Sequence, residues 1–220
     1  MAHTKSEVLQ RIHEVGLVPV LRAKSAAEAI QLADAITAGG IPVVEVTMTV
    51  PGALDVIREI VEHSGHRILV GAGTVLDPET ARACMLAGAQ FIVSPSLNLK
   101  TIEICRRDGI AVIPGALTPT EIVTAWEAGA DVVKVFPCSA VGGPKYLKAL
   151  KAPLPQIHLI PTGGVSLATA AEFLAAGAFA LGVGGDLVDH EAIARGDIAA
   201  ITRNAEKYAE IVRAARVPRP

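Results

Sequence analysis

Two ionisable residues lie within apolar runs that have the composition of buried β-strands. Lys134 is the third residue of Val-Val-Lys-Val-Phe-Pro, and Glu45 is the third residue of Val-Val-Glu-Val-Thr-Met. A charge in such surroundings costs several kcal/mol unless it is paired or neutralised. Desolvation lowers the pKa of a lysine amine, and the neutral amine is the form that attacks a carbonyl carbon to make a Schiff base. Lys134 and Glu45 are therefore the first candidates for catalysis.

Two glycine-rich segments later in the chain have the character of phosphate-binding loops. The first is Pro-Thr-Gly-Gly-Val at 161–165, and the second is Gly-Val-Gly-Gly-Asp at 182–186. Glycine lets backbone N–H groups approach an anion closely, although a tight turn alone also favours it. Two such segments after consecutive strand candidates favour a phosphate site between them. Asp186 would repel an anion if it faced inward, so we expect it to cap the segment that follows.

Other polar residues follow apolar runs and suit the recognition of a small keto acid. Thr74, Ser94 and Thr162 carry hydroxyl groups that can contact a carboxylate or a keto oxygen, or can instead cap a helix or shape a turn. Arg22 closes the first strand candidate. Its guanidinium can either bind an anionic group or neutralise Glu45, and both readings stay open here.

Composition limits the classes of function. The chain has 220 residues, of which 51% are hydrophobic and only 3% aromatic, so Ala, Val, Ile and Leu must build most of its core. Twenty Lys and Arg residues against 22 Asp and Glu give a formal charge of −2, and no basic run suggests a nucleic-acid partner. The cysteines, Cys84, Cys105 and Cys138, are widely spaced and fit neither a disulfide framework nor a zinc site. No base is evident for Cys138, so we expect it to pack rather than react.

Nothing in the sequence indicates a membrane segment. The first residues lack the apolar region of a secretion signal, and the most apolar stretch, 173–185, is too short to span a bilayer. We therefore expect a cytoplasmic protein without a membrane partner.

Short β-branched runs alternate with longer alanine-rich segments, which predicts an α/β fold with a parallel sheet. The strand candidates are 17–22, 42–48, 68–75, 91–95, 111–116, 132–137, 158–163 and 180–184. Capping residues at Ser25, Asp77 and Thr118 mark helix starts between them, and Ala-Gly pairs mark helix ends. Eight such units without a linker predict one domain over 1–220, a (β/α)8 TIM barrel with an extra N-terminal helix at Lys5–Val15. An open doubly wound sheet is the rival, which the lack of a dinucleotide fingerprint disfavours.

A barrel would bring the two ionisable residues together. Active sites of such barrels lie at the carboxyl ends of the strands, and inward residues of alternate strands share a layer. Glu45 belongs to the second strand and Lys134 to the sixth, so the two would face each other across the barrel mouth. The alternatives are a structural ion pair inside the barrel and a lysine that extends between the outer helices.

The chain carries a set of motifs that occur together: Glu45-Val46-Thr47, Gly71-Ala72-Gly73-Thr74-Val75, Ser94-Pro95, Pro114-Gly115, Lys134-Val135-Phe136-Pro137, Gly142-Gly143 and Pro161-Thr162-Gly163-Gly164. This set, which extends over about 15–188, resembles the 2-keto-3-deoxy-6-phosphogluconate (KDPG) aldolase family, also called 4-hydroxy-2-oxoglutarate (KHG) aldolase. The resemblance implies a class I aldolase that needs no metal and no cofactor, and a homotrimer.

The resemblance also implies roles for individual residues. Lys134 matches the Schiff-base lysine and Glu45 the general acid and base. The positions that contact pyruvate are Thr74, Pro95 and Thr162, and those of the phosphate loops are Gly163, Gly164, Gly184 and Gly185. The implied reaction cleaves KDPG to pyruvate and glyceraldehyde 3-phosphate, and 4-hydroxy-2-oxoglutarate to pyruvate and glyoxylate.

Two positions depart from the phosphogluconate pattern. Thr49 stands where family members usually have an Arg that contacts the substrate carboxylate, and Gly185 stands where a Ser is common. The related 2-keto-3-deoxy-6-phosphogalactonate aldolases also lack that Arg and instead have one at the position of Arg22, so this substrate is the alternative. Rivals from other classes are a non-covalent phosphate-binding barrel isomerase or synthase and a catalytically silent sugar-phosphate-binding barrel.

Overall fold

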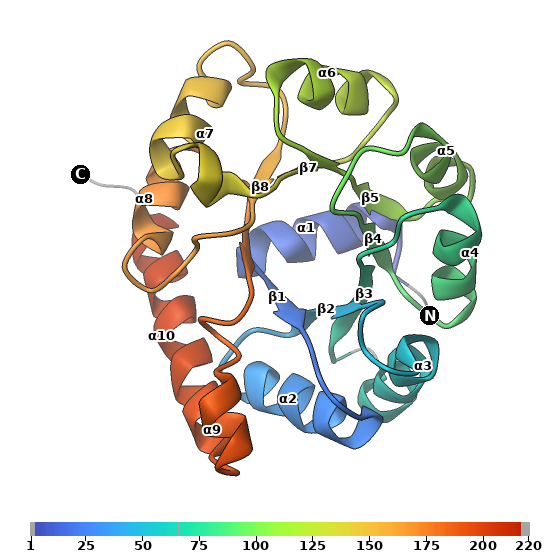
Figure 1. Cartoon of the computed structure of the whole chain (residues 1–220), viewed down its shortest axis with the longest axis vertical. Coiled ribbons are helices and arrows are strands. Elements are labelled where there is room, and N and C mark those ends of the chain that lie inside the picture. Colours follow the sequence, from blue (N-terminus) through green and yellow to red (C-terminus); the bar gives the residue numbers. More distant parts are fainter. Residues whose placement is uncertain (1–2, 66, 217–220) are drawn as a thin grey trace.

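The computed structural model describes residues 3–65 and 67–216, with the side chain of His190 left out, so the ends of the predicted domain 1–220 lie outside the described residues. The chain begins with helix α1 (Lys5–Val15), whose bounds agree with the prediction. Thr4 and Glu7 form a capping box at its start, and Gly16 ends it in the left-handed conformation. In Figure 1, α1 lies behind the strands and crosses the space that they surround.

Each predicted strand is present, with shorter bounds. The strands are β1 (Leu17–Leu21), β2 (Val43–Thr47), β3 (Leu69–Gly73), β4 (Phe91–Val93), β5 (Ala111–Ile113), β6 (Gly115–Ala116), β7 (Val133–Val135), β8 (Leu159–Pro161) and β9 (Leu181–Val183). Every residue in them is buried, as expected for parallel strands covered on both faces. The predicted strand 111–116 is divided into β5 and β6 because Pro114 has no N–H to donate to a ladder.

The strands pair in parallel and curl. Six of them follow the order β5-β4-β3-β2-β1-β9, and the other three follow the order β6-β7-β8. The segment 111–116 pairs with β4 through β5 and with β7 through β6. Beyond β8, Thr162 forms an isolated parallel bridge with Gly182 of β9. The predicted α/β class with a parallel sheet is confirmed.

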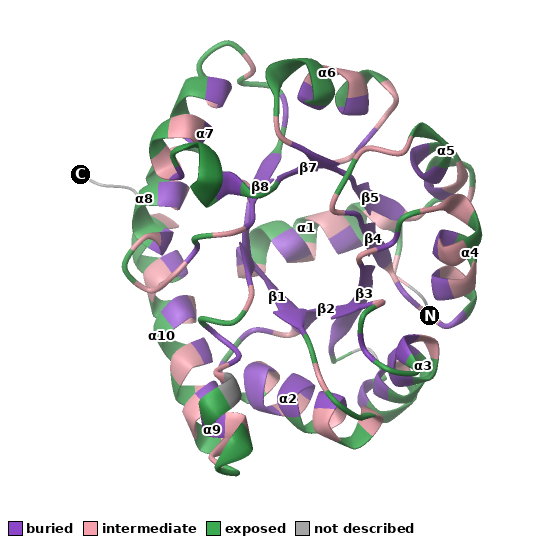
Figure 2. Ribbon diagram, in the orientation of Figure 1, coloured by how far each residue is buried: buried purple, intermediate pink, exposed green. Residues whose placement is uncertain are grey.

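The helices lie outside the strands, with their buried faces turned inward (Figures 1 and 2). They are α2 (Ala26–Ala38), α3 (Ala53–Ser64), α4 (Pro78–Leu86), α5 (Leu99–Arg107), α6 (Pro119–Glu127), α7 (Pro144–Lys151), α8 (Ala170–Ala175), α9 (His190–Ala194) and α10 (Ile198–Arg216), with a short 3₁₀ helix η1 (Cys138–Val141). The caps predicted at Ser25, Asp77 and Thr118 are confirmed. Thr118 forms a complete capping box with Glu121. The capping box that the sequence predicts for Ser25 and Glu28 is not formed, because the carboxylate of Glu28 accepts from Lys24 N instead of Ser25 N.

The core has two apolar clusters. The larger cluster fills the layer between the strands and the surrounding helices. The smaller cluster joins strand residues such as Val43, Phe91 and Ile160 to Val8 and Ile12 of α1. The end of the sheet that faces α1 is therefore filled with apolar side chains, which leaves the carboxyl ends of the strands for polar chemistry. Among the described residues, no helix has both the length and the apolar character that a membrane crossing requires.

Candidate active site

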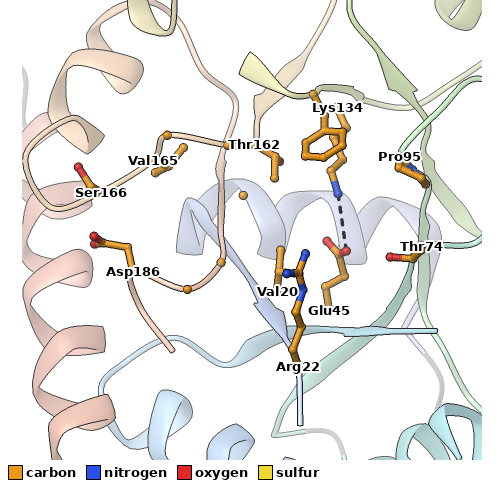
Figure 3. A pocket seen from close by; sticks show the side chains of 16 residues that line it. Val20, Arg22, Glu45, Thr74, Pro95, Lys134, Thr162, Val165, Ser166 and Asp186 are labelled. Carbon is orange, nitrogen blue, oxygen red and sulfur yellow. Dashed lines mark ion pairs between the residues drawn. The ribbon is translucent and has the colours of Figure 1, made fainter. Parts of the chain in front are cut away.

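A cavity of about 500 Å³ lies at the carboxyl ends of the strands. Side chains from several strands and from the loops after β8 and β9 line it (Figure 3). The predicted site residues among its lining are Arg22, Glu45, Thr74, Pro95, Lys134, Thr162, Gly163, Gly164, Gly184 and Gly185. The curl of the sheet thus brings together residues that lie more than 160 positions apart in the sequence.

Lys134 points from β7 toward Glu45 on β2. Its Nζ lies 3.7 Å from Oε1 of Glu45, and the lysine is only 7% exposed. This distance is longer than a direct hydrogen bond, so the contact is an ion pair. The amine also lies 5.4 Å from the centroid of the Phe136 ring, within the range of a cation–π contact. Lys134 is therefore buried beside one carboxylate and one aromatic face, at the wall of the cavity.

Glu45 is the more deeply buried member of the pair, with 2% of its surface exposed. Its Oε1 makes no hydrogen bond within the described part of the chain. Burial raises the pKa of Glu45, and the nearby charges of Lys134 and Arg22 oppose that rise. A carboxyl group with a raised pKa and an unused oxygen at a cavity wall is suited to exchange protons with a bound molecule.

Two glycines make room for the functional side chains. A Cβ at Gly73, at the end of β3, would lie 2.0 Å from Oε1 of Glu45. A Cβ at Gly182 would lie 2.0 Å from Oγ1 of Thr162. Real Cβ atoms do not approach other atoms this closely, so any larger residue at either position would displace the polar group that it faces.

Thr74 holds a backbone conformation that is rare for its residue type. Its φ is 59°, and among the described residues it is the one non-glycine with positive φ. A β-branched residue is strained there, and such strain is found most often at functional sites. Pro95 lies nearby in the lining, whereas the hydroxyl of Ser94 donates to the carbonyl of Val75 at 2.7 Å. Ser94 thus supports a turn, one of the two roles that its position allowed.

Arg22 and Thr49 have different environments. Arg22 lines the cavity beside Glu45 (Figure 3), and within residues 3–65 and 67–216 its guanidinium makes no hydrogen bond or ion pair. Thr49 is not among the lining residues; it lies in the turn after β2, with its hydroxyl 2.7 Å from that of Thr47. The structure therefore does not bring Thr49 to the other predicted site residues.

The loops after β8 and β9 form the end of the cavity away from Pro95 (Figure 3). Gly163 and Gly164 have φ values of 91° and 76°, which favour glycine, and a Cβ at Gly184 or Gly185 would meet no atom within 4 Å. Backbone N–H groups in such loops are accessible to an anion.

Asp186 differs from its prediction, since it does not cap the segment that follows. Its Oδ1 accepts from Leu167 N at 3.2 Å and from the hydroxyl of Tyr208. The carboxylate therefore joins the loop after β9 to the loop after β8 and to α10. These partners lie 19 and 22 residues away in the sequence, beyond the reach of a capping pattern.

Several lining residues were not among the predicted site residues: Val20, Phe136, Val165, Ser166 and Gly182. Val20 had a usable signal, because residues two apart on a strand point to the same side and Arg22 had already been singled out. Cys138 is buried, and burial raises its pKa to about 11, which agrees with the predicted packing role. Among the described residues, no group of three or more His, Cys, Asp or Glu side chains could hold a metal ion.

Comparisons with known proteins agree in one family. The family model of KDPG and KHG aldolases matches residues 8–204. The KHG/KDPG aldolase of Escherichia coli (strain K12) is 38% identical over 195 residues, which cover 88% of this chain and 91% of the relative. The 2-dehydro-3-deoxy-6-phosphogalactonate aldolase of the same strain is 40% identical over 172 residues, covering 78% of this chain and 83% of the relative.

A solved structure of a KDPG aldolase has a similar fold. The KDPG aldolase of Legionella pneumophila, with pyruvate captured at low pH as a covalent carbinolamine intermediate, is 30% identical and has a TM-score of 0.84. The match covers 90% of this chain and 96% of that chain. The relatives are aldolases, which are lyases, and the chain therefore belongs to the KDPG and KHG aldolase family.

Proposed function

We propose that this protein is a class I aldolase that cleaves KDPG to pyruvate and glyceraldehyde 3-phosphate, with Lys134 as the Schiff-base residue. The observation that carries the proposal is the buried amine of Lys134, 3.7 Å from Oε1 of Glu45 at the wall of the cavity. The covalent carbinolamine named for the Legionella relative supports the same chemistry here. Glu45 is the proton-transfer group because it is the carboxylate within reach of that amine.

The reaction begins with the neutral amine of Lys134. The amine attacks the C2 carbonyl of the keto acid, and loss of water leaves a protonated imine that withdraws electrons from C3. Glu45 accepts the proton of the C4 hydroxyl while the C3–C4 bond breaks, which releases the aldehyde. The electron pair of that bond forms a neutral enamine instead of an unstable carbanion. The enamine is then protonated at C3, and hydrolysis of the imine yields pyruvate and the free lysine.

The lining suits the two ends of such a substrate. The keto acid end lies near Thr74, Pro95 and Thr162, which share the cavity wall with Lys134. The phosphate end lies between the loops after β8 and β9, where glycine residues leave the backbone accessible. A phosphate there is separated from the reacting carbon, so binding energy gained at one end can orient the other.

The substrate range extends to neighbouring compounds. We include 4-hydroxy-2-oxoglutarate, which would give pyruvate and glyoxylate. The alternative main substrate is 2-keto-3-deoxy-6-phosphogalactonate, which the position of Arg22 in the cavity supports, together with the relative that bears that name. A panel of the three compounds, compared by kcat/KM with the wild-type protein, identifies the preferred one.

The test of the covalent mechanism is reductive trapping. The protein is incubated with pyruvate and borohydride, and the mass increase is mapped by peptide analysis. We expect the label on Lys134 and its loss in Lys134→Ala. The matched control is Lys148→Ala, which removes an exposed lysine of α7. Turnover without a trapped adduct would favour the non-covalent isomerase or synthase. If the protein shows no turnover and traps no adduct, a silent sugar-phosphate-binding barrel is favoured.

The proposed architecture is a single-domain (β/α)8 barrel over 1–220. Continuity of the chain from β5 to β6 and the bridge between Thr162 and Gly182 support closure of the two sheets into one ring. We further propose a cytoplasmic homotrimer that needs no metal or cofactor, as the family resemblance implies. Sedimentation velocity tests the trimer, and unchanged turnover in the presence of EDTA tests the metal-free mechanism.

A further inference from the structure

Asp186 connects three parts of the protein at the proposed phosphate end of the cavity. It lines the cavity from the loop after β9, and its Oδ1 accepts from Leu167 N in the loop after β8. The same oxygen accepts from the hydroxyl of Tyr208 on α10. Among the described residues, the contact with Leu167 is the one hydrogen bond that joins 163–169 to 184–188.

The loop after β8 is also braced from within. The hydroxyl of Thr169 accepts from Ser166 N at 2.9 Å and donates to the carbonyl of Gly164 at 2.8 Å. In the loop after β9, Leu187 N donates to the carbonyl of Gly184 at 3.1 Å. Each loop is therefore held internally, and the hydrogen bond from Leu167 N to Asp186 joins the two.

Tyr208 is suited to act as a permanent donor to Asp186. It is 0% exposed, and burial, followed by the hydrogen bond and the charge of Asp186, raises the pKa of its phenol well above the usual range. The hydroxyl therefore keeps its proton at any physiological pH. A carboxylate beside an anion site is unfavourable, and the dipoles of donors that bind one of its oxygens offset part of this repulsion.

We propose that Asp186 and Tyr208 form a clamp that holds the two glycine loops at the separation needed to bind the phosphate end of the substrate. The two are positioning residues, because the backbone of the loops makes the contact. This inference rests on the proposed aldolase function. The clamp contributes to the affinity for phosphorylated substrates, whereas the residues around Lys134 bind the keto acid end.

The test compares a phosphorylated with an unphosphorylated substrate. Tyr208→Phe removes only the hydroxyl, and Asp186→Ala removes the acceptor for both donors. The matched control is Tyr146→Phe, since the Tyr146 hydroxyl also donates to a loop carbonyl, that of Leu117, but the residue does not line the cavity. Steady-state kinetics are measured with KDPG and with 4-hydroxy-2-oxoglutarate. In parallel, the melting temperature is measured with and without inorganic phosphate.

For Tyr208→Phe and Asp186→Ala we expect KM for KDPG to rise about tenfold, the usual effect of losing a hydrogen bond to a charged group. The kinetics with 4-hydroxy-2-oxoglutarate should stay unchanged, and stabilisation by phosphate should be lost. Tyr146→Phe should behave as the wild type. Asp186→Asn, whose amide oxygen still accepts from both donors, should retain stabilisation by phosphate.

If Tyr208→Phe and Asp186→Ala impaired the kinetics with both substrates equally, or left KM for KDPG unchanged, the clamp would be overturned. If Tyr208→Phe does not fold, Asp186→Ala decides the question, because Asp186 is exposed and leaves no core cavity. Phosphate binding does not depend on aldol chemistry. A wild-type protein that phosphate stabilises but that cleaves none of the three compounds of the panel would therefore refute the aldolase assignment, while loss of that stabilisation in the variants would still support the clamp. A wild-type protein that phosphate does not stabilise would refute the clamp.

Discussion

The carboxylate of Glu45 occupies the space that a side chain at position 73 would need: a Cβ at Gly73 would lie 2.0 Å from Oε1. The same oxygen is the one that lies 3.7 Å from Nζ of Lys134. The position of Glu45, the proposed proton-transfer group, thus depends on glycine at position 73 of the neighbouring strand, with which Glu45 pairs through Gly71.

Gly73→Ala should therefore impair catalysis more than stability. The methyl group displaces the carboxylate from Lys134, and a misplacement of about 1 Å can lower kcat about 10²-fold. The matched control is Gly71→Ala on the same strand, where a Cβ would meet the Phe91 ring at 2.2 Å. That variant should lower the melting temperature without changing the pH dependence of kcat. A Gly73→Ala enzyme with wild-type kcat would contradict the positional argument.

The acid limb of the pH profile should belong to Glu45. Burial raises the pKa of this carboxyl, and the step that breaks C3–C4 needs its charged form. Activity should therefore fall as pH decreases through the raised pKa. Glu45→Gln should lower kcat about 10²–10⁴-fold and abolish this limb, while pyruvate is still trapped on Lys134. The measurement is kcat against pH for both proteins, and a limb that persists in Glu45→Gln would assign it to another group.

Arg22 should bind an anionic group of the substrate, a role that Thr49 cannot perform. Arg22 lines the cavity and Thr49 does not. Arg22→Ala should lower kcat/KM about tenfold or more, because a hydrogen bond to a charged group contributes about 1.5–3 kcal/mol. Thr49→Ala, the control, should have little effect. Turnover and substrate affinity that are both unchanged in Arg22→Ala would eliminate this role.

Thr74 should show a conflict between stability and activity. Its φ of 59° costs about 1–3 kcal/mol for a residue other than glycine. Thr74→Gly removes this strain, so the free energy of unfolding should not decrease, whereas kcat/KM should fall because the hydroxyl leaves the cavity. Urea denaturation and steady-state kinetics on the same preparations test both parts. A clear loss of stability would show that the conformation of Thr74 is not strained.

Much of this molecule can be predicted from local sequence, for definite reasons. The caps at Asp77 and Thr118, the extent of α1 and the buried strands follow from hydrogen-bonding and hydrophobic patterns within a few residues. Lys134 and Glu45 could be singled out because a charge within an apolar strand is costly wherever the strand lies. The pairing of the two followed from strand order and is seen in the structure.

The remaining features depend on contacts between distant segments. Strand length was overestimated, since pairing with the neighbouring strands covers only part of each apolar run, and Pro114 divided one candidate in two. No local sequence pattern predicts that Thr49 lies outside the cavity lining. The same holds for the hydrogen bonds of Asp186 with Leu167 and Tyr208. By itself, the sequence determined which residues are too costly to bury without a partner. Only the tertiary structure decided which atoms meet, because the curl of the sheet and the packing of α10 set distances between residues far apart in the chain.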